Sequence, residues 1–265
     1  MELLFVISGL LVGFVVGISG VGGGSLMTPL LVMGFGVPPA TAVGTDLLYA
    51  GFTKIGGTIF RGKLGSVNWK VAFLLALGSV PAAIFTSVYY LSPVQIDSAS
   101  SILITKTLGV MLCITAIALV FRSKLQRLTQ GIFGIKPAGR RARILIATLG
   151  LGAVLGILVT LTSVGAGAIG VTALLVLYPH LPANHLAGTD IVHAVPLTLV
   201  AGLSHAVSGS VDYHLLLTLL IGSLPGVVLG SLVAHRIPEK PLQWVIGVVL
   251  FLVGLKLFFY DIGMY

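Results

Sequence analysis

The 265-residue chain is 57% hydrophobic and only 8% charged, with a mean hydropathy of +1.12, whereas soluble domains carry about 25% charged residues. This composition excludes an ordinary soluble domain and predicts a membrane protein whose apolar surface is covered by lipid. The net charge of +8 does not indicate nucleic-acid binding, because seven of the fifteen Lys and Arg residues lie between 122 and 143 and four more between 54 and 70. Clusters of this kind are typical of cytoplasmic loops.

The first apolar stretch, 3–36, follows no basic segment and precedes no small-residue cleavage site, so we expect it to stay in the mature protein. It is about 35 residues long, more than the roughly 20 that one span requires, and Ile18-Ser-Gly-Val-Gly-Gly-Gly-Ser25 interrupts it. Glycine runs destabilise helices, so this stretch is predicted to be a broken helix or a tight hairpin. Three spans of ordinary length follow, at 40–60, 69–91 and 102–121.

The basic segment 122–143 comes next, and after it the same arrangement begins again. A second long apolar stretch, 144–179, is interrupted by Leu161-Thr-Ser-Val-Gly-Ala-Gly-Ala168. Further spans are predicted at 184–206, 213–234 and 241–260. The chain is therefore predicted to be an all-α polytopic membrane protein.

The two halves of the chain form an internal repeat. Gly44-Thr45-Asp46 recurs 144 residues later as Gly188-Thr189-Asp190, and the same shift carries Gly78-Ser79 and Pro81 onto Gly222-Ser223 and Pro225. A shift of 143 carries Val21-Gly22 and Gly24 onto Val164-Gly165 and Gly167. We therefore divide the chain into a first transmembrane repeat at 1–121, a basic cytoplasmic linker at 122–143 and a second transmembrane repeat at 144–265.

The distribution of charge indicates the orientation of each half. If the linker is cytoplasmic, the spans 102–121 and 69–91 lead back to the same side and place Arg61 and Lys63 there. The loop 205–214, which matches this region in the second half, contains no Lys or Arg. The second half carries its basic residues in its other loop, 235–240. This reversal predicts two inverted-topology repeats with both termini outside. Each repeat would contain a broken or re-entrant first helical hairpin followed by three transmembrane helices.

Matching interrupted helices in two inverted repeats are typical of a transporter's substrate site. A new helix is expected to begin near Ser25 and another near Gly167. The first N–H groups of each helix have no intrahelical partner, the helix dipole adds positive charge there, and glycine lets an anion approach closely. The alternative is that these glycines only allow close helix packing, as expected for Gly222, Gly226 and Gly230. The predicted substrate-binding residues are Ser19, Gly20, Val21, Gly22, Gly23, Gly24, Ser25, Thr162, Ser163, Val164, Gly165, Ala166 and Gly167.

Ionisable residues inside spans are functional candidates by default. Asp46 and Asp190 are repeat mates, and each either bonds the free N–H groups of a neighbouring half-helix or couples an ion or proton to transport. Lys54 either attracts an anion or extends to the cytoplasmic interface, and His193 can join a proton path. His205 is expected at an interface. The predicted coupling or supporting residues are Thr45, Asp46, Lys54, Thr189, Asp190 and His193.

Other chemistries lack a pattern in this sequence. The glycine run at 20–24 is not followed by the Lys-Ser/Thr of a phosphate-binding loop, no zinc-ligand spacing is present, and we expect no cofactor or metal. The chain is therefore predicted not to be an enzyme. The residues fit a secondary transporter that uses alternating access, and they also fit a passive anion channel. A membrane enzyme or an assembly partner is a third, less supported class.

Taken together, the motifs resemble those of a known family. They include Gly17-Ile-Ser-Gly-Val-Gly-Gly-Gly24 with Pro29 after it, Ala42-Val-Gly-Thr-Asp46, Thr162-Ser-Val-Gly-Ala-Gly167, Ala187-Gly-Thr-Asp190 and Gly222-Ser-Leu-Pro-Gly226. This set is similar to the TauE/SafE sulfite exporter family of membrane permeases over nearly the whole chain. The resemblance implies transport of sulfite or an organosulfonate such as sulfoacetate across the plasma membrane, with H⁺ or Na⁺ as the coupling ion if transport is coupled. Ala166 stands where the first half has Gly23, so the two half-sites are not equivalent.

Overall fold

The computed structural model describes residues 2–19, 24–63, 65, 67–90, 98–132, 140–233 and 239–259, and all regular secondary structure within them is helical. The helices of the first half are α1 (Glu2–Ser19), α2 (Gly24–Phe35), α3 (Pro39–Lys63), α4 (Trp69–Tyr90) and α5 (Ser98–Ile132). Those of the second half are α6 (Arg140–Thr162), α7 (Ala168–Leu177), α8 (Ala183–Val207), α9 (Tyr213–Val233) and α10 (Glu239–Phe258). Helix α5 thus continues into the first part of the predicted linker 122–143.

Six helices of the described chain are long and apolar enough to cross a membrane. They contain the segments Trp69–Tyr89, Ile104–Arg122, Ala142–Thr162, Asn184–Val207, Tyr213–Val233 and Pro241–Phe258. Five of these match predicted spans of ordinary length, and Ala142–Thr162 forms the first part of the predicted broken stretch. The prediction of an all-α multi-pass membrane protein is therefore confirmed.

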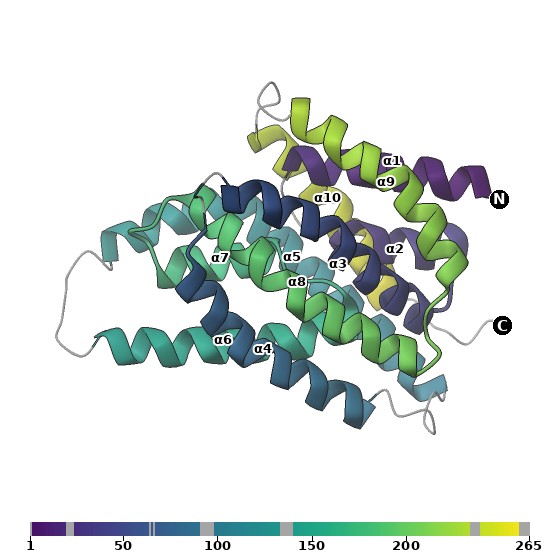
Figure 1. Ribbon diagram of the computed structural model, residues 1–265, viewed down its shortest axis with the longest axis horizontal. Coiled ribbons are helices and arrows are strands. Elements are labelled where there is room, and N and C mark those ends of the chain that lie inside the picture. Colours follow the sequence, from purple (N-terminus) through teal and green to yellow (C-terminus); the bar gives the residue numbers. More distant parts are fainter. Residues whose placement is uncertain are drawn as a thin grey trace.

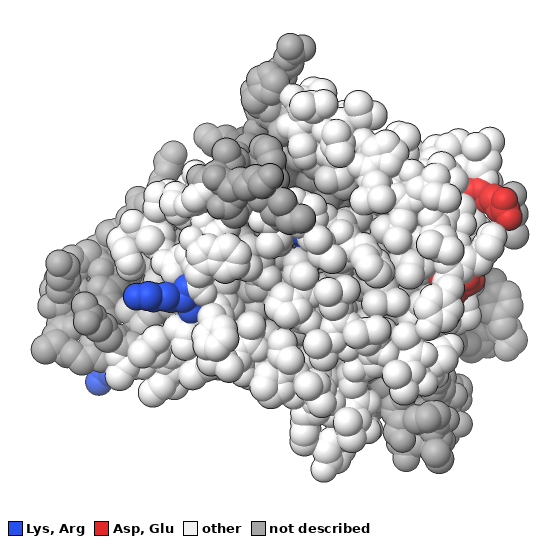
Figure 2. All heavy atoms as spheres, in the orientation of Figure 1, with Lys and Arg blue, Asp and Glu red and all other residues white. Residues whose placement is uncertain are grey.

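The outward faces of these helices are apolar. Phe73 and Leu77 of α4 and Leu217 and Ile221 of α9 each expose about half of their side chains or more, as expected for residues in contact with lipid. The face in Figure 2 is almost free of charged residues between a few basic atoms near one end and acidic atoms near the other.

Helix α3 differs from the predicted span 40–60, because it is not among the six apolar spanning helices. Every residue from Ala42 to Gly51 is buried in the protein. A helix enclosed by other helices needs no apolar lipid-facing surface, so it can carry polar groups such as Asp46 and Lys54. Helix α3 is the central helix of the first half, and it packs along its counterpart α8 (Figure 1).

Except for α2, whose main partner is α3, the helices of each half pack mainly on the other half. Helix α1 lies along α9, α4 along α6 and α5 along α10, and Figure 1 shows the α1–α9 and α4–α6 pairs on opposite sides of α3 and α8. Glycines allow this close approach: a β-carbon at Gly222 would overlap the carbonyl oxygen of Val6, and one at Gly78 would overlap that of Leu149. The predicted packing role of Gly222, and of Gly226 and Gly230 after it, is confirmed.

Residues at equivalent positions in the two repeats make the same contact with the opposite repeat. The Asn68 N–H donates a 2.9 Å hydrogen bond to Thr189 Oγ1, and the Asp212 N–H, 144 residues further on, donates a 3.1 Å bond to Thr45 Oγ1. Because Thr45 and Thr189 are also 144 residues apart, the two bonds are copies of one another. The repeat seen in the sequence is therefore matched by a repeat of contacts across the bundle.

The predicted break of the second half is present, whereas residues 20–23 of the first predicted break lie outside the described residues. Helix α1 ends at Ser19 and α2 begins at Gly24, while α6 ends at Thr162 and α7 begins at Ala168. Helix α2 has 12 residues and α7 has 10, so they are about 18 and 15 Å long at 1.5 Å per residue. Each is therefore about half the length that the hydrocarbon core of a bilayer requires.

Candidate functional site

The break between α6 and α7 is buried inside the protein. Every residue from Thr162 to Ala168 is buried, and Gly165 and Gly167 have φ angles of 122° and 124°, which only glycine adopts without strain. The Thr162 hydroxyl donates to the Leu158 carbonyl at 2.6 Å and lies 3.2 Å from the Val164 N–H. Gly167 is the N-cap of α7 and has no side-chain capping bond. The positive end of the α7 dipole is therefore directed into the protein interior.

The two aspartates each lie beside the start of a short helix of their own half. Asp46 of α3 is fully buried, and its Oδ2 accepts a hydrogen bond from the Thr28 hydroxyl in the second turn of α2. Asp190 of α8 is equally buried and faces the Gly167 N–H at the start of α7. Gly170 leaves the space for it, because a β-carbon there would overlap Asp190 Oδ1. Each carboxylate therefore lies beside a half-helix of its own repeat, with Asp46 bonded to the Thr28 hydroxyl and Asp190 facing the Gly167 N–H.

Lys54 and His193 complete a buried group of polar side chains. Lys54 is 8% exposed and lies close enough to Asp46, Asp190 and His193 to interact with each electrostatically. His193 Nε2 is 2.9 Å from Ser79 Oγ, and its Nδ1 is 4.0 Å from Asp190 Oδ1. With His193 neutral, Lys54 is the one positive charge of this group beside two carboxylates, and Arg122 of α5 also interacts electrostatically with Asp190.

We call the residues Thr28, Asp46, Lys54, Ser79, Ser163, Asp190 and His193 the polar cluster. Several of its atoms have no hydrogen-bond partner among the described residues, namely Asp46 Oδ1, both carboxylate oxygens of Asp190, Ser163 Oγ and His193 Nδ1. Buried polar atoms are nearly always hydrogen-bonded in proteins, because leaving one unsatisfied costs about 1–3 kcal/mol. Such a concentration of unsatisfied atoms indicates a place that receives a ligand, an ion or a proton.

Ser163 connects the polar cluster to the α6–α7 break. It is the one non-glycine residue of the described chain with a positive φ, 58°, and its hydroxyl faces Asp46 across the boundary between the halves. A left-handed conformation is strained for a serine. The break therefore places a hydroxyl and a helix N-terminus from the second half next to a carboxylate from the first.

The other predicted substrate-binding residues lie in different surroundings. Gly20, Val21, Gly22 and Gly23 fall outside the described residues, as do the side-chain environments of Ser19 and Gly24, whereas Ser25 is buried in the first turn of α2. The side chains of Val164 and Ala166 pack in hydrophobic clusters, so these two residues can offer a ligand only their backbone groups. The Thr45 and Thr189 hydroxyls bind the opposite half through Asp212 and Asn68.

Two residues of the polar cluster were missed by sequence reasoning. Thr28 and Ser79 were not singled out as site residues, although each lies beside a motif: Thr28 precedes Pro29, and Ser79 belongs to the repeated Gly-Ser-x-Pro sequence. His205, which was expected at an interface, is fully buried in the protein, with its Nε2 2.9 Å from the Thr160 carbonyl oxygen. This bond joins α8 to α6 just before the break.

Comparison with known proteins identifies the family. The model of the family described as "Sulfite exporter TauE/SafE" matches residues 5–257, nearly the whole chain. The chain belongs to the TauE/SafE family. This confirms the resemblance seen in the duplicated motifs and makes the protein a membrane transporter with several spans in the plasma membrane.

Relatives in this family are described as transporters. The chain is 37% identical to the probable membrane transporter protein YjnA of Bacillus subtilis, over 97% of this chain and all of the relative. It is 26% identical to YdhB of the same organism and 25% identical to a probable membrane transporter protein of Methanocaldococcus jannaschii, covering at least 93% of each chain. No solved structure matches this protein.

Proposed function

We propose that this protein is a secondary transporter of a small sulfur oxyanion, either sulfite or an organosulfonate such as sulfoacetate, and that it works by alternating access. The observation that carries the proposal is the buried N-terminus of α7, which opens onto the polar cluster in the interior of a membrane protein. Helix N-termini bind anions because their N–H groups and dipole supply positive partial charge. The name of the family supports a sulfur oxyanion as the substrate.

The charges of the polar cluster favour a coupled mechanism. An anion can accept hydrogen bonds from the N-terminus of α7 and the Ser163 hydroxyl, and it is attracted by Lys54. The carboxylates of Asp46 and Asp190 repel it unless a cation compensates for their negative charge. We propose that H⁺ or Na⁺ provides this compensation and moves with the anion. The unpartnered carboxylate oxygens are the atoms that would take up either cation.

An inverted relation between the two repeats would allow the protein to alternate between two states. The exchange of equivalent contacts between the halves supports this relation. The halves also differ in one respect: α7 packs closely on α5, whereas α2 makes few contacts with its counterpart α10. In the proposed cycle, α2 comes to pack closely on α10 while α7 separates from α5. The substrate site then opens first on one side of the membrane and next on the other.

Cysteine labelling tests the inverted topology on a matched pair. Trp69 and Tyr213 are repeat mates, begin α4 and α9, and are each 59% exposed. In a Cys113→Ser background, we expect Trp69→Cys to react with a membrane-impermeant maleimide only from the cytoplasm and Tyr213→Cys only from outside. Labelling of both cysteines from the same side would contradict the inverted model, and the membrane-permeant reagent serves as the control for reactivity.

Transport assays test the substrate site. We expect Ser163→Ala to reduce the uptake of labelled sulfite or sulfoacetate into proteoliposomes by about ten-fold or more, since a hydrogen bond to a charged group contributes roughly 1.5–3 kcal/mol. Ser231→Ala is the matched control, because Ser231 lies exposed on α9 and bonds only its own helix at Val227. Wild-type rates in Ser163→Ala would contradict the proposed site.

The same preparation distinguishes a transporter from a passive anion channel. A coupled transporter accumulates the anion above its electrochemical gradient when a proton or sodium gradient is imposed, and Asp46→Asn or Asp190→Asn abolishes this accumulation. Flux that never exceeds the gradient and is unchanged in both variants would indicate a channel.

A further inference from the structure

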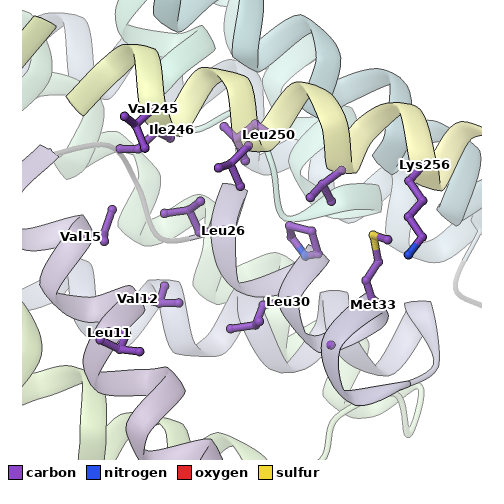
Figure 3. Close-up of a pocket in the computed structure, with 14 residues that line it drawn as sticks. Leu11, Val12, Val15, Leu26, Leu30, Met33, Val245, Ile246, Leu250 and Lys256 are labelled. Atoms are coloured by element: carbon purple, nitrogen blue, oxygen red, sulfur yellow. The ribbon is translucent and has the colours of Figure 1, made fainter. Parts of the chain in front are cut away.

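An apolar groove lies between α1, α2 and α10. It has a volume of about 510 Å³ and is formed by one face each of α1, α2 and α10 (Figure 3). Thirteen of its fourteen lining residues are apolar, and the exception is Lys256. Leu11, Val245 and Val249 are 57%, 62% and 46% exposed, so the groove opens to the surface that faces lipid.

The dimensions of the groove match one leaflet of a bilayer. Its lining residues on α10 run from Val245 to Lys256, a distance of about 16 Å at 1.5 Å per residue. The hydrocarbon core of a bilayer is about 30 Å thick, so one leaflet contributes about 15 Å. An extended acyl chain lying beside α10 would therefore fill the groove along its length.

Lys256 lies at the end of the groove where a lipid headgroup would be. It is two residues from the end of the spanning segment Pro241–Phe258, and Figure 3 shows its side chain extending from α10 toward Met33 of α2. It forms no ion pair with any residue that the structure describes. A lysine at this depth attracts an anionic headgroup, with about 1 kcal/mol per contact.

The equivalent helices of the second half pack closely together. There, α7 packs on α5, and Ala168 and Val164 share a hydrophobic cluster with Leu108 and Met111. The groove therefore lies where α2 of the first half is separated from α10 of the second half. Because α2 also carries Thr28, which bonds Asp46, whatever occupies the groove contacts the helix that supports the polar cluster.

We propose that this groove binds an anionic phospholipid, with an acyl chain along α2 and α10 and its phosphate group at Lys256. The lipid fills the space that separates α2 from α10 and so supports the position of α2. The proposal concerns a site separate from the polar cluster and does not depend on which anion the protein transports.

Lipid binding to the purified, full-length protein in a neutral detergent tests this proposal. Titration with phosphatidylglycerol, followed by native mass spectrometry and by the thermal unfolding midpoint, should show one preferred lipid and a raised midpoint. Lys256→Gln should weaken phosphatidylglycerol binding about five-fold, the loss expected for one lysine–headgroup contact. Val249→Trp, which fills the groove, should remove the preferred binding altogether.

Two controls make the result specific. Lys106→Gln removes an exposed lysine of α5 at the same end of the α5–α10 pair, outside the groove, and should leave binding unchanged. Phosphatidylcholine should bind more weakly than phosphatidylglycerol, and inorganic phosphate should not raise the midpoint. Equal binding of the two lipids, or Lys256→Gln and Val249→Trp proteins that bind phosphatidylglycerol like the wild type, would overturn the proposal. A midpoint raised by inorganic phosphate alone would show a free-anion site instead.

Discussion

Replacing Lys54 by methionine should destabilise the protein and abolish transport. Lys54 is buried beside Asp46 and Asp190, and methionine keeps its length but removes its charge. The two carboxylates then remain buried without a neighbouring lysine. Removing one partner of a buried charged group typically costs about 3–5 kcal/mol, a large part of the total stability of a protein. The measurement is the thermal unfolding midpoint in detergent, together with anion uptake in proteoliposomes.

A second change should separate stability from transport. Adding Asp190→Asn to Lys54→Met removes one of the uncompensated charges, so the midpoint should recover by most of the initial loss while transport stays absent. Lys124→Met is the matched control, since Lys124 is exposed in the part of α5 that lies beyond the spanning segment. If Lys54→Met keeps a wild-type midpoint and a wild-type transport rate, Lys54 contributes nothing to the polar cluster and the charge balance proposed above is incorrect.

Replacing Gly222 by valine should prevent the protein from folding. A β-carbon at this position would overlap the backbone carbonyl of Val6, and α1 would have to move away from α9 to make room. Overpacking costs about 1–3 kcal/mol even where side chains can adjust, and a backbone contact leaves less room for adjustment. We therefore expect little or no monodisperse protein in size-exclusion chromatography after extraction.

The same substitution at Gly150 is the control. Gly150 lies within α6, where an added β-carbon meets no other atom within 4 Å, so Gly150→Val changes the helix propensity equally without a steric clash. Gly78→Val, at the repeat mate of Gly222, should fail like Gly222→Val because its β-carbon overlaps the Leu149 carbonyl. Normal yields of Gly222→Val protein would contradict the close α1–α9 packing.

The positions of the helices followed from local features of the sequence. Apolar length located five spans, and the small residues at 161–168 located the break between α6 and α7, because a glycine run cannot continue a helix at low cost. The surroundings of α3 could not be predicted in this way. Its apolar length indicated a span, but only the packing of α8 and its neighbours decides that Ala42 to Gly51 face protein on all sides.

The polar cluster was only partly predictable for a similar reason. Asp46, Asp190 and His193 were recognisable because ionisable groups within apolar helices are rare. Thr28 and Ser79 were not, because a hydroxyl in a membrane helix most often bonds its own backbone, as Thr53 does with Tyr49. Which hydroxyls turn toward a carboxylate or an imidazole depends on the rotation of α2 and α4 about their axes. That rotation is fixed by tertiary contacts, mainly with α3 for α2 and with α6 and α8 for α4.

The packing of helices from one half on helices from the other half has a consequence for biogenesis. The linker 122–143 divides the sequence into two similar parts, but α1 finds its main partner in α9 and α4 in α6. When only the first repeat has been synthesised, neither of these helices has that partner. Until the second repeat is inserted, the glycine surfaces of α1 and α4 have no helix packed against them. The Thr45 hydroxyl likewise lacks its bond from Asp212. We therefore expect the packing of each repeat to be complete only when both repeats are in the membrane.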